Sequence, residues 1–472
     1  MSAPTTVASS EGSLFELLAR GNKDVYFFQD FPTSKFIFDN QYEAQAPSSF
    51  EIRRVPPLTA VEFGRMVEFE LDLVGDVMRD PTLLITLPSW LPPSYQATNT
   101  TSVIQDLSGN TYGYTNGIGY FLFEKIQFYQ DNILLQEFSG DSLWASSQIE
   151  GTFSKSPIHS KQTGQHSGTA LEIARNATPQ MLRLSIPLPG CQKNSDPGFP
   201  QRSCISHRYK LKCKLRKLED LIECSDGREK PSPFGIQMTQ QTSRDTTPTQ
   251  FQTLQRIHLL PLSIQFETKQ VYLPREYQDL LQKTPSEIPF NRVYENIFTT
   301  SPSDYISVQG GSTSSITRRL DARHPSQRLL WFFRNQTSIK TNQLWKLTTG
   351  YSSLALLIAG QVRETSRSPL VWRDIVNQAK EELDSSLTID SVPLEIGTMN
   401  WSLGSIAPKR FDIIDSQPTG SIEFSTADRP TLYIELANPN VQNPYIELRV
   451  LIDTWAVFQT DGKGRAELLS AN

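Results

Sequence analysis

Short runs in which apolar and polar residues alternate recur along the chain, and they predict a protein built mainly of β-strands. The clearest runs are Glu62–Leu73 and His207–Leu218, in which apolar residues recur at every second position. Because successive side chains of a strand point to opposite faces, this spacing gives each strand one buried face and one solvated face. Between Tyr120–Gln130 and Ile133–Leu135, the Asp-Asn pair at 131–132 predicts the tight turn of an antiparallel hairpin.

Further strands and a few short helices complete the expected elements. We also expect strands at Asp24–Phe28, Lys35–Phe38, Met181–Pro187, Ile257–Thr268, Arg328–Arg334, Thr431–Leu436 and Ile446–Phe458. Apolar residues at helical spacing occur in Gly12–Gly21 and Asp374–Leu383. The pattern therefore predicts the all-β class with a few short helices.

Polar stretches divide the chain. Residues 88–118, 151–178 and 301–318 are expected to form long loops, and loops of this length in a compact domain usually carry function. The polar run 225–256 is the best candidate for a linker. We therefore expect an N-terminal segment at 1–23, a first domain at 24–224, a linker at 225–256 and a second domain at 257–472.

The composition indicates an ordered protein with no evident affinity for nucleic acid. Among the 472 residues, 38% are hydrophobic and 20% are charged, and the 31 prolines favour short strands over long helices. The net charge of −5 gives no electrostatic basis for binding nucleic acid directly. We interpret the lysines of His207–Leu218 as the solvated face of a sheet, where they also discourage pairing at the edge.

The first residues and the apolar runs predict a soluble protein made in the cytosol. The N-terminus has no basic region followed by an apolar run, as a signal peptide would. Ser2 stands where N-myristoylation requires glycine. The longest apolar run, Leu354–Ala359, is too short to span a bilayer.

Four cysteines occur in one region, at positions 191, 204, 213 and 224. None is spaced as C-x-x-C, so a zinc site that uses Cys204 and His207 is the weaker interpretation. Reduced, structural thiols are expected instead, with Cys213 facing inward from its strand.

Four blocks of residues carry a family resemblance. The first block comprises Tyr114, Asn116, Ile118, Gly119, Tyr120, Gly140, Asp141, Leu143 and Trp144. A second, near the N-terminus, comprises Leu14, Leu17, Gly21, Asp24, Val25 and Tyr26. A third comprises Leu320, His324, Pro325, Leu329 and Trp331, with Arg323 in place of the usual Asn. The last is the turn and strand Gln417–Ser425 followed by Asp428, with Glu423 in place of the usual Asn.

In their order along the chain, and over nearly its whole length, the blocks resemble those of the major capsid proteins of nucleocytoplasmic large DNA viruses. The resemblance implies two tandem eight-stranded antiparallel jelly-roll sandwiches in one chain. It implies a structural protein of the virion's capsid shell, made and assembled in the host cytoplasm, and neither an enzyme nor a holder of a cofactor or metal.

The partners follow from the same resemblance. The chain would form a homotrimeric, pseudo-hexagonal capsomer that contacts neighbouring capsomers and minor capsid proteins. An inner viral membrane would lie nearby without the chain inserting into it. A paralogous minor capsomer, or an assembly scaffold protein of the same fold, would share these motifs and remains an alternative.

A GDSL-type serine hydrolase is a more remote alternative. Residues 140–143 spell Gly-Asp-Ser-Leu, and Asp321 and His324 have the D-x-x-H spacing that would complete a triad with Ser142. Such enzymes are α/β proteins with a parallel sheet, whereas this chain lacks alternating strands and helices. They also use an Asn donor for the oxyanion, usually in G-x-N-D, and this chain has no Asn-Asp pair.

Overall fold

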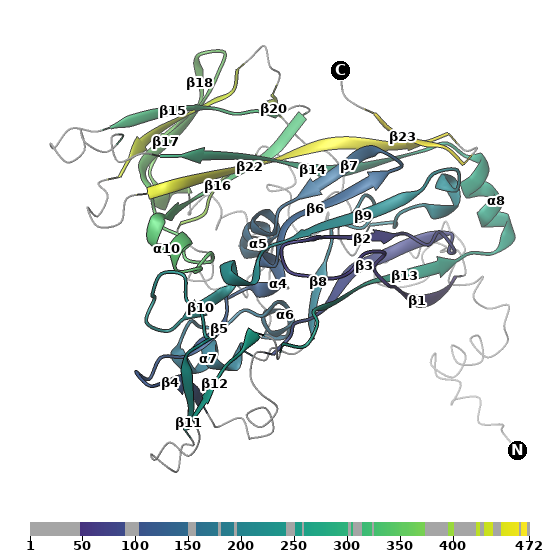
Figure 1. Cartoon of the computed structure of the whole chain (residues 1–472). Helices are drawn as coiled ribbons and strands as arrows, with labels where there is room; N and C mark the ends of the chain where they lie inside the picture. Colours follow the sequence, from purple (N-terminus) through teal and green to yellow (C-terminus); the bar gives the residue numbers. More distant parts are fainter. Residues whose placement is uncertain are drawn as a thin grey trace, which may run out of the picture.

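Two antiparallel β-sandwiches lie side by side and follow one another along the chain (Figure 1). The computed structural model describes residues 48–89, 103–149, 157–177, 181–192, 196–241, 251–256, 259–300, 304, 314–322, 325–372, 395–400, 422–424, 429–437, 445–461 and 464–469. The structural statements that follow refer to these residues.

The first sandwich consists of two four-stranded sheets. One has the order β1 (Ser49–Val55), β13 (Ser263–Tyr272), β3 (Val77–Thr86) and β8 (Leu182–Ser185). The other has the order β2 (Met66–Glu70), β9 (Tyr209–Leu215), β6 (Phe123–Gln130) and β7 (Ile133–Phe138). All pairs are antiparallel.

The second sandwich repeats this arrangement. One sheet has the order β14 (Ser286–Thr299), β22 (Tyr445–Thr460), β16 (Pro325–Asn335) and β19 (Gly397–Asn400), with β20 (Ile422–Glu423) on β16 and β23 (Ala466–Leu469) on β22. The other has the order β15 (Ser315–Arg319), β21 (Thr431–Leu436), β17 (Tyr351–Ile358) and β18 (Gln361–Arg367). In both sandwiches the first strand pairs with a strand from the far end of the domain (β1 with β13, β14 with β22), and the second strand pairs with an earlier one (β2 with β9, β15 with β21), which is the jelly-roll topology. The predicted all-β fold of two tandem jelly rolls is confirmed.

The strand pairing differs from the predicted domain boundaries. Strand β13 lies within 257–472, the range expected to be the second domain, yet it pairs with β1 and β3 as the last strand of the first sandwich. The predicted linker 225–256 carries β11 (Gln237–Gln241) and β12 (Phe251–Thr253). Its polar composition marks a connection within the first sandwich, and the pairing favours a boundary at helix α8 (Arg275–Lys283).

Long connections of the first sandwich gather in a layer at one end, at the lower left of Figure 1. This loop layer contains β4 (Val103–Asp106), β5 (Tyr112–Tyr114), β10 (Ile222–Cys224), β11, β12 and α7 (Ala170–Arg175). Strand β11 pairs with both β4 and β12, and β10 pairs with β5. The ranges 88–118 and 151–178, which were expected to be loops throughout, thus contain short strands and the helices α6 (Pro157–Thr163) and α7.

One predicted strand begins later than expected. In Tyr120–Gln130 the strand starts at Phe123, and the residues before it form the helical turn α4 (Ile118–Phe121), which follows Gly117 at a φ of 76°. All four residues of α4 are buried, so the apolar run reflects burial on every side rather than a strand. The predicted turn is confirmed, since Asp131 adopts a positive φ of 51° between β6 and β7.

The remaining helices are short. They are α5 (Gly140–Ile149), α10 (Gln336–Lys340) and the 3-10 turns η2 (Gln201–Cys204) and η3 (Leu218–Asp220). In the described part of the chain, no helix has the length and apolar character needed to cross a membrane. Several predictions lie outside the described residues: Gly12–Gly21, Asp24–Phe28, Lys35–Phe38, Asp374–Leu383 and most of Gln417–Ser425.

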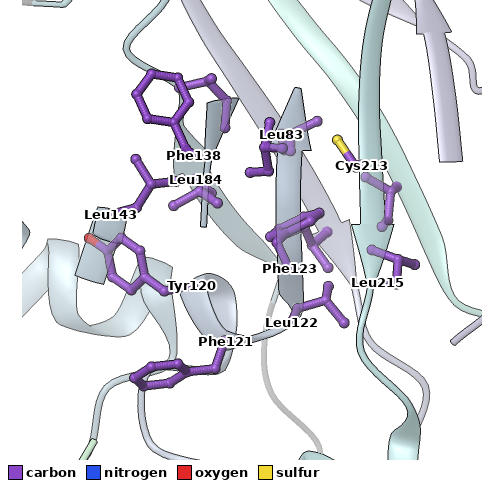
Figure 2. Packing of buried hydrophobic residues seen from close by; sticks show 14 of the residues in the cluster. Leu83, Tyr120, Phe121, Leu122, Phe123, Phe138, Leu143, Leu184, Cys213 and Leu215 are labelled. Carbon is purple, nitrogen blue, oxygen red and sulfur yellow. The ribbon is translucent and has the colours of Figure 1, made fainter. Parts of the chain in front are cut away.

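The two hydrophobic cores differ in extent. The core of the second sandwich is formed by its own strands, with Trp331 and Leu354 fully buried at its centre. The core of the first sandwich gathers Leu83, Phe123 and Cys213 from three strands (Figure 2). This first core continues onto the second sandwich, whose sheet β14-β22-β16-β19 contributes buried apolar side chains to it.

Candidate functional site

The contact between the two sandwiches contains the Gly-Asp-Ser-Leu segment. These residues begin helix α5, directly after β7. The amide N–H of Ser142 donates to Ser139 Oγ (2.9 Å), and the amide N–H of Ser139 donates to Ser142 Oγ (3.0 Å). The hydroxyl of Ser142 in turn donates to the Ser139 carbonyl (2.8 Å). Ser142 is buried, so its hydroxyl serves as a reciprocal helix cap rather than as an accessible nucleophile.

Asp321, a second predicted member of the triad, makes its hydrogen bonds elsewhere. Asp321 is exposed on the second sandwich, where its amide N–H donates to Asn296 Oδ1 (2.8 Å) and its carbonyl accepts from Asn296 Nδ2 (3.1 Å). His324 lies outside the described residues. Ser142 and Asp321 thus have separate partners, and the arrangement gives no support to the hydrolase alternative.

Asp141 is the charged centre of the contact between the sandwiches. Its carboxylate lies 2.6 Å from Arg334 Nη2, 2.5 Å from Arg216 Nη2 and 3.0 Å from Arg449 Nη1. Arg216 belongs to the first sandwich, whereas Arg334 on β16 and Arg449 on β22 belong to the second. Burial alone would raise the pKa of Asp141, but the three guanidinium groups hold that pKa well below its usual value.

Two further carboxylates complete the cluster. Arg449 lies 2.6 Å from Glu295 and 2.6 Å from Glu447, and Arg334 lies 3.3 Å from Glu447. Three guanidinium groups therefore face three carboxylates, and the buried charges balance. Buried ions are tolerated when they are paired in this way.

Aromatic side chains surround this charged cluster. The guanidinium of Arg334 lies 5.6 Å from the ring centre of Phe121 and 5.1 Å from that of Phe332. Trp144 on α5 meets Phe332 on β16 edge to face, with ring centroids 6.5 Å apart. The Trp of the first sequence block thus packs across the boundary between the two sandwiches.

Two glycines of the first block lie where the backbone passes close to other backbone. A Cβ on Gly140 would be 2.1 Å from the carbonyl oxygen of Tyr120, and one on Gly119 would be 2.9 Å from that of Thr163. Both distances are too short for any side chain. The block therefore requires glycine at these positions for packing.

A second buried contact ties the loop layer to the second sandwich. Asn116, from the first block, exchanges two hydrogen bonds of 2.8 Å with the backbone of His166. His166 Nε2 lies 3.0 Å from Glu223 Oε1, and both side chains are buried. The indole N–H of Trp345, in the second sandwich, donates to Glu223 Oε2 (3.1 Å). Sequence reasoning missed His166, Glu223 and Trp345, because no motif connects residues so far apart in the chain.

The four cysteines have the surroundings expected of structural thiols. Cys213 is fully buried and faces inward from β9, as predicted, and all four cysteines are free. His207 Nδ1 lies 2.7 Å from Asp131 Oδ2, so this histidine has a carboxylate partner. Among the residues that the structure describes, no group of three or more His, Cys, Asp or Glu side chains could hold a metal ion.

The lysine face of β9 has partners within its own sheet. Burial along β9 alternates strictly, as predicted. Lys212 Nζ lies 3.4 Å from Glu68 and 5.0 Å from the ring centre of Tyr129. Lys214 donates to the carbonyl of Gly64 (3.0 Å).

The third and fourth sequence blocks contribute to the core of the second sandwich. Leu320, Leu329 and Trp331 are buried there, and Trp331 meets Trp372 edge to face at 5.5 Å. Of Gln417–Ser425 the structure describes residues 422–424, among which Phe424 is buried in the same core.

Solved structures share this arrangement of two sandwiches. PBCV-1 VP54, fitted into a reconstruction of the virophage Sputnik, superposes with a TM-score of 0.67 at 13% sequence identity, over 93% of this chain and 100% of that chain. The fold is the double jelly roll of viral capsid proteins. The Faustovirus major capsid protein matches with a TM-score of 0.56 at 11% identity, over 97% of this chain and 99% of that one.

The structure of this chain is thus similar to the structures of these proteins over nearly the whole chain, although the sequence identity is low. The structure of the Sputnik virophage also matches, with a TM-score of 0.52 at 10% identity over 94% of this chain and 92% of that chain. No protein-family model matches the sequence, and no curated protein matches it.

Proposed function

We propose that the chain is a structural capsid protein of a large icosahedral DNA virus. The observation that carries this proposal is the repetition of one jelly-roll topology twice in a single chain, with the two copies joined through a continuous core. The likeness to PBCV-1 VP54 and the Faustovirus major capsid protein over more than nine-tenths of the chain supports it.

The assembly unit is a homotrimer. Each chain has two similar sandwiches, so a trimer has six. Six similar sandwiches give the trimer a near-hexagonal outline, which can tile a flat facet. The balanced charge cluster around Asp141 and the packing of Trp144 on Phe332 hold the two sandwiches of a chain in one orientation. A rigid orientation is what tiling requires, since each unit must present the same outline to its neighbours.

The loop layer supplies the outer crown of the capsomer. It is built from connections of one end of the first sandwich, where loops can vary without disturbing the sheets. The capsomer contacts neighbouring capsomers and minor capsid proteins within the virion, after assembly in the host cytoplasm. The chain works mechanically, with neither a cofactor nor a catalytic residue.

Sedimentation velocity and native mass measurement of the purified full chain test this function. We expect a stable trimer, because obligate interfaces of this type bury on the order of 2,000–5,000 Å². A chain that stays monomeric at high concentration would contradict the proposal. Copy number per particle, measured on purified virions, separates a main shell protein from a minor capsomer.

A further inference from the structure

The turn between helices α6 and α7 carries His166, and we call residues 164–169 the His166 turn. Its backbone is fixed to the segment after β5, because the amide N–H of Gly117 donates to the carbonyl of Gly164 (3.0 Å). The exchange of hydrogen bonds between Asn116 and the backbone of His166 fixes it at a second point. The ring of His166 therefore starts from a fixed backbone.

The hydrogen bonds of His166 indicate which ring nitrogen carries the proton. The amide N–H of Gly168 donates to His166 Nδ1 (3.0 Å), so Nδ1 acts as an acceptor and carries no proton. In the neutral ring the proton is then on Nε2, which lies 3.0 Å from Glu223 Oε1. The contact thus joins a neutral imidazole to a buried carboxylate.

A second proton on this ring does not fit the turn. It would sit on Nδ1 and point at the N–H of Gly168, and two donors cannot bond to each other. The turn packs closely on the second sandwich at this point, since a Cβ on Gly168 would be 3.2 Å from the ring of Trp345. Trp345 in turn donates its indole N–H to Glu223 Oε2 (3.1 Å). A movement of Gly168 away from His166 therefore also changes the surroundings of Trp345.

Glu223 is the charged group that faces His166, and its attraction favours a proton on the ring. The charged side chains on the elements around the turn are exposed or paired with other groups: Lys161, Glu172, Arg175, Glu219 and Lys346. The Nε2–H group faces Glu223 in both charge states of the ring, whereas Nδ1 accepts from Gly168 only in the neutral state. Protonation thus keeps the first contact and removes the second.

A second histidine on the same connection responds to acid in the same direction. His159 on α6 shares a hydrogen bond with the hydroxyl of Tyr120 (2.8 Å). Burial lowers the pKa of His159. A histidine whose pKa is lower in the folded state binds its proton more readily when released, so its packing weakens as the pH falls below about 6.5.

We propose that the His166 turn is a pH-dependent switch that changes the contact between the loop layer and the second sandwich. When His166 takes up a proton, its ring stays with Glu223, the N–H of Gly168 loses its acceptor, and residues 167–169 move away from Trp345. The loop layer remains attached, because Asn342 Nδ2 donates to the carbonyls of Glu219 and Ile222 (2.7 Å each) and these bonds involve no titratable group. The inference concerns the chain itself and is independent of the proposed capsid function.

Hydrogen exchange of the purified full chain, followed by mass spectrometry at about pH 7.5 and about pH 5.5, tests the switch. After correction for the intrinsic effect of pH on exchange, we expect peptides covering 164–169 and 343–348 to exchange at least about tenfold faster at the lower pH, because the N–H of Gly168 has lost its bond. Peptides of β6 and β9 should remain protected. Unchanged exchange at 164–169, or an increase shared equally by all peptides, would overturn the inference.

Two histidine variants identify the group that responds. His166→Gln provides a donor and an acceptor but cannot ionise, so residues 164–169 should exchange at the same rate at both pH values. His207→Gln is the matched control, because His207 lies outside the loop layer beside Asp131 (2.7 Å), and this variant should keep the full response. A response that persists in His166→Gln, or that is lost in His207→Gln, would show that His166 is not the switch.

A third variant decides the matter if His166→Gln exchanges rapidly at both pH values because the amide does not fit. Trp345→Phe keeps an aromatic ring against Gly168 and removes the indole N–H that binds Glu223. Glu223 then attracts the proton of His166 more strongly, so the increase in exchange at 164–169 should begin at a higher pH in a series from about pH 8 to about pH 5. An unchanged midpoint would overturn the inference.

Discussion

The carboxylate of Asp141 in the first sandwich lies 2.6 Å from the guanidinium of Arg334 in the second, and the two side chains are 0% and 1% exposed. Removing both ions from water costs several kcal/mol each, which a single attraction does not reliably offset. Arg216 and Arg449 add to the attraction, while Glu295 and Glu447 balance the excess of positive charge. Because the charges come from both sandwiches, the cluster favours the orientation in which they meet.

Replacing Asp141 with Asn keeps the shape of the side chain and removes its charge. Three buried guanidinium groups then face two carboxylates, and we expect the free energy of unfolding to fall by about 3–5 kcal/mol. Guanidinium chloride titration followed by tryptophan fluorescence measures this change. Asp279→Asn is the control, because Asp279 pairs with Lys283 (3.5 Å) where the two side chains are 50% and 75% exposed, and this change should cost about 0–1 kcal/mol. Equal costs for the two variants would mean that the cluster does not stabilise the contact.

The same carboxylate predicts how stability depends on pH. The pKa of Asp141 is lower in the folded protein than the value of about 3.9 in an unfolded chain, so the unfolded chain takes up this proton first as the pH falls. Its stabilising contribution is complete above about pH 4 and decreases as the pH falls toward the folded-state pKa. The difference in unfolding free energy between the unaltered chain and Asp141→Asn should therefore stay constant from about pH 7 to pH 5 and shrink below about pH 4. A difference that disappears between about pH 7 and pH 5 would show that another group controls it.

Ser142→Ala separates the capping role from the catalytic one. Because the Ser142 hydroxyl is buried and bonded to Ser139, its loss should lower the free energy of unfolding by about 1 kcal/mol, the usual cost of removing a helix cap. Hydrolysis of a short-chain p-nitrophenyl ester should proceed at the same background rate with either protein. Turnover that is present in the unaltered chain and lost in Ser142→Ala would revive the hydrolase alternative.

The sequence predicted those features that depend on neighbours in the chain. Alternation in His207–Leu218 identified the inward residues of β9, because burial in a strand repeats every second residue. The turn at Asp131 followed from residue types that tolerate a positive φ. Tyr120 and Phe121, which end the helical turn α4, were mistaken for strand because a segment buried on every side carries no periodicity.

Features that depend on distant partners could not be predicted in this way. Strand β13 looks like any half-buried strand, and its place between β1 and β3 is decided by pairing with residues 177 to 223 positions earlier. Asp141 belonged to a recognisable block, yet nothing in the sequence indicated that Arg334 and Arg449 would meet it. Strand pairing favours a domain boundary at α8, and composition could not indicate this, since a polar stretch marks exposed chain whether it joins two domains or two strands of one domain.

The four thiols should react slowly in the folded protein. Burial raises the pKa of Cys191 and of Cys204 to about 12, raises that of Cys224 to about 11, and raises that of the fully buried Cys213 as well. Since the thiolate is the reactive form, little of any of them is available near neutral pH. We expect Ellman's reagent at pH 8 to modify less than one thiol per chain within minutes under native conditions and all four in guanidinium chloride. Rapid stoichiometric reaction of the native protein would show that at least one of these sulfurs is accessible as thiolate, contrary to the packing around β9 and β10.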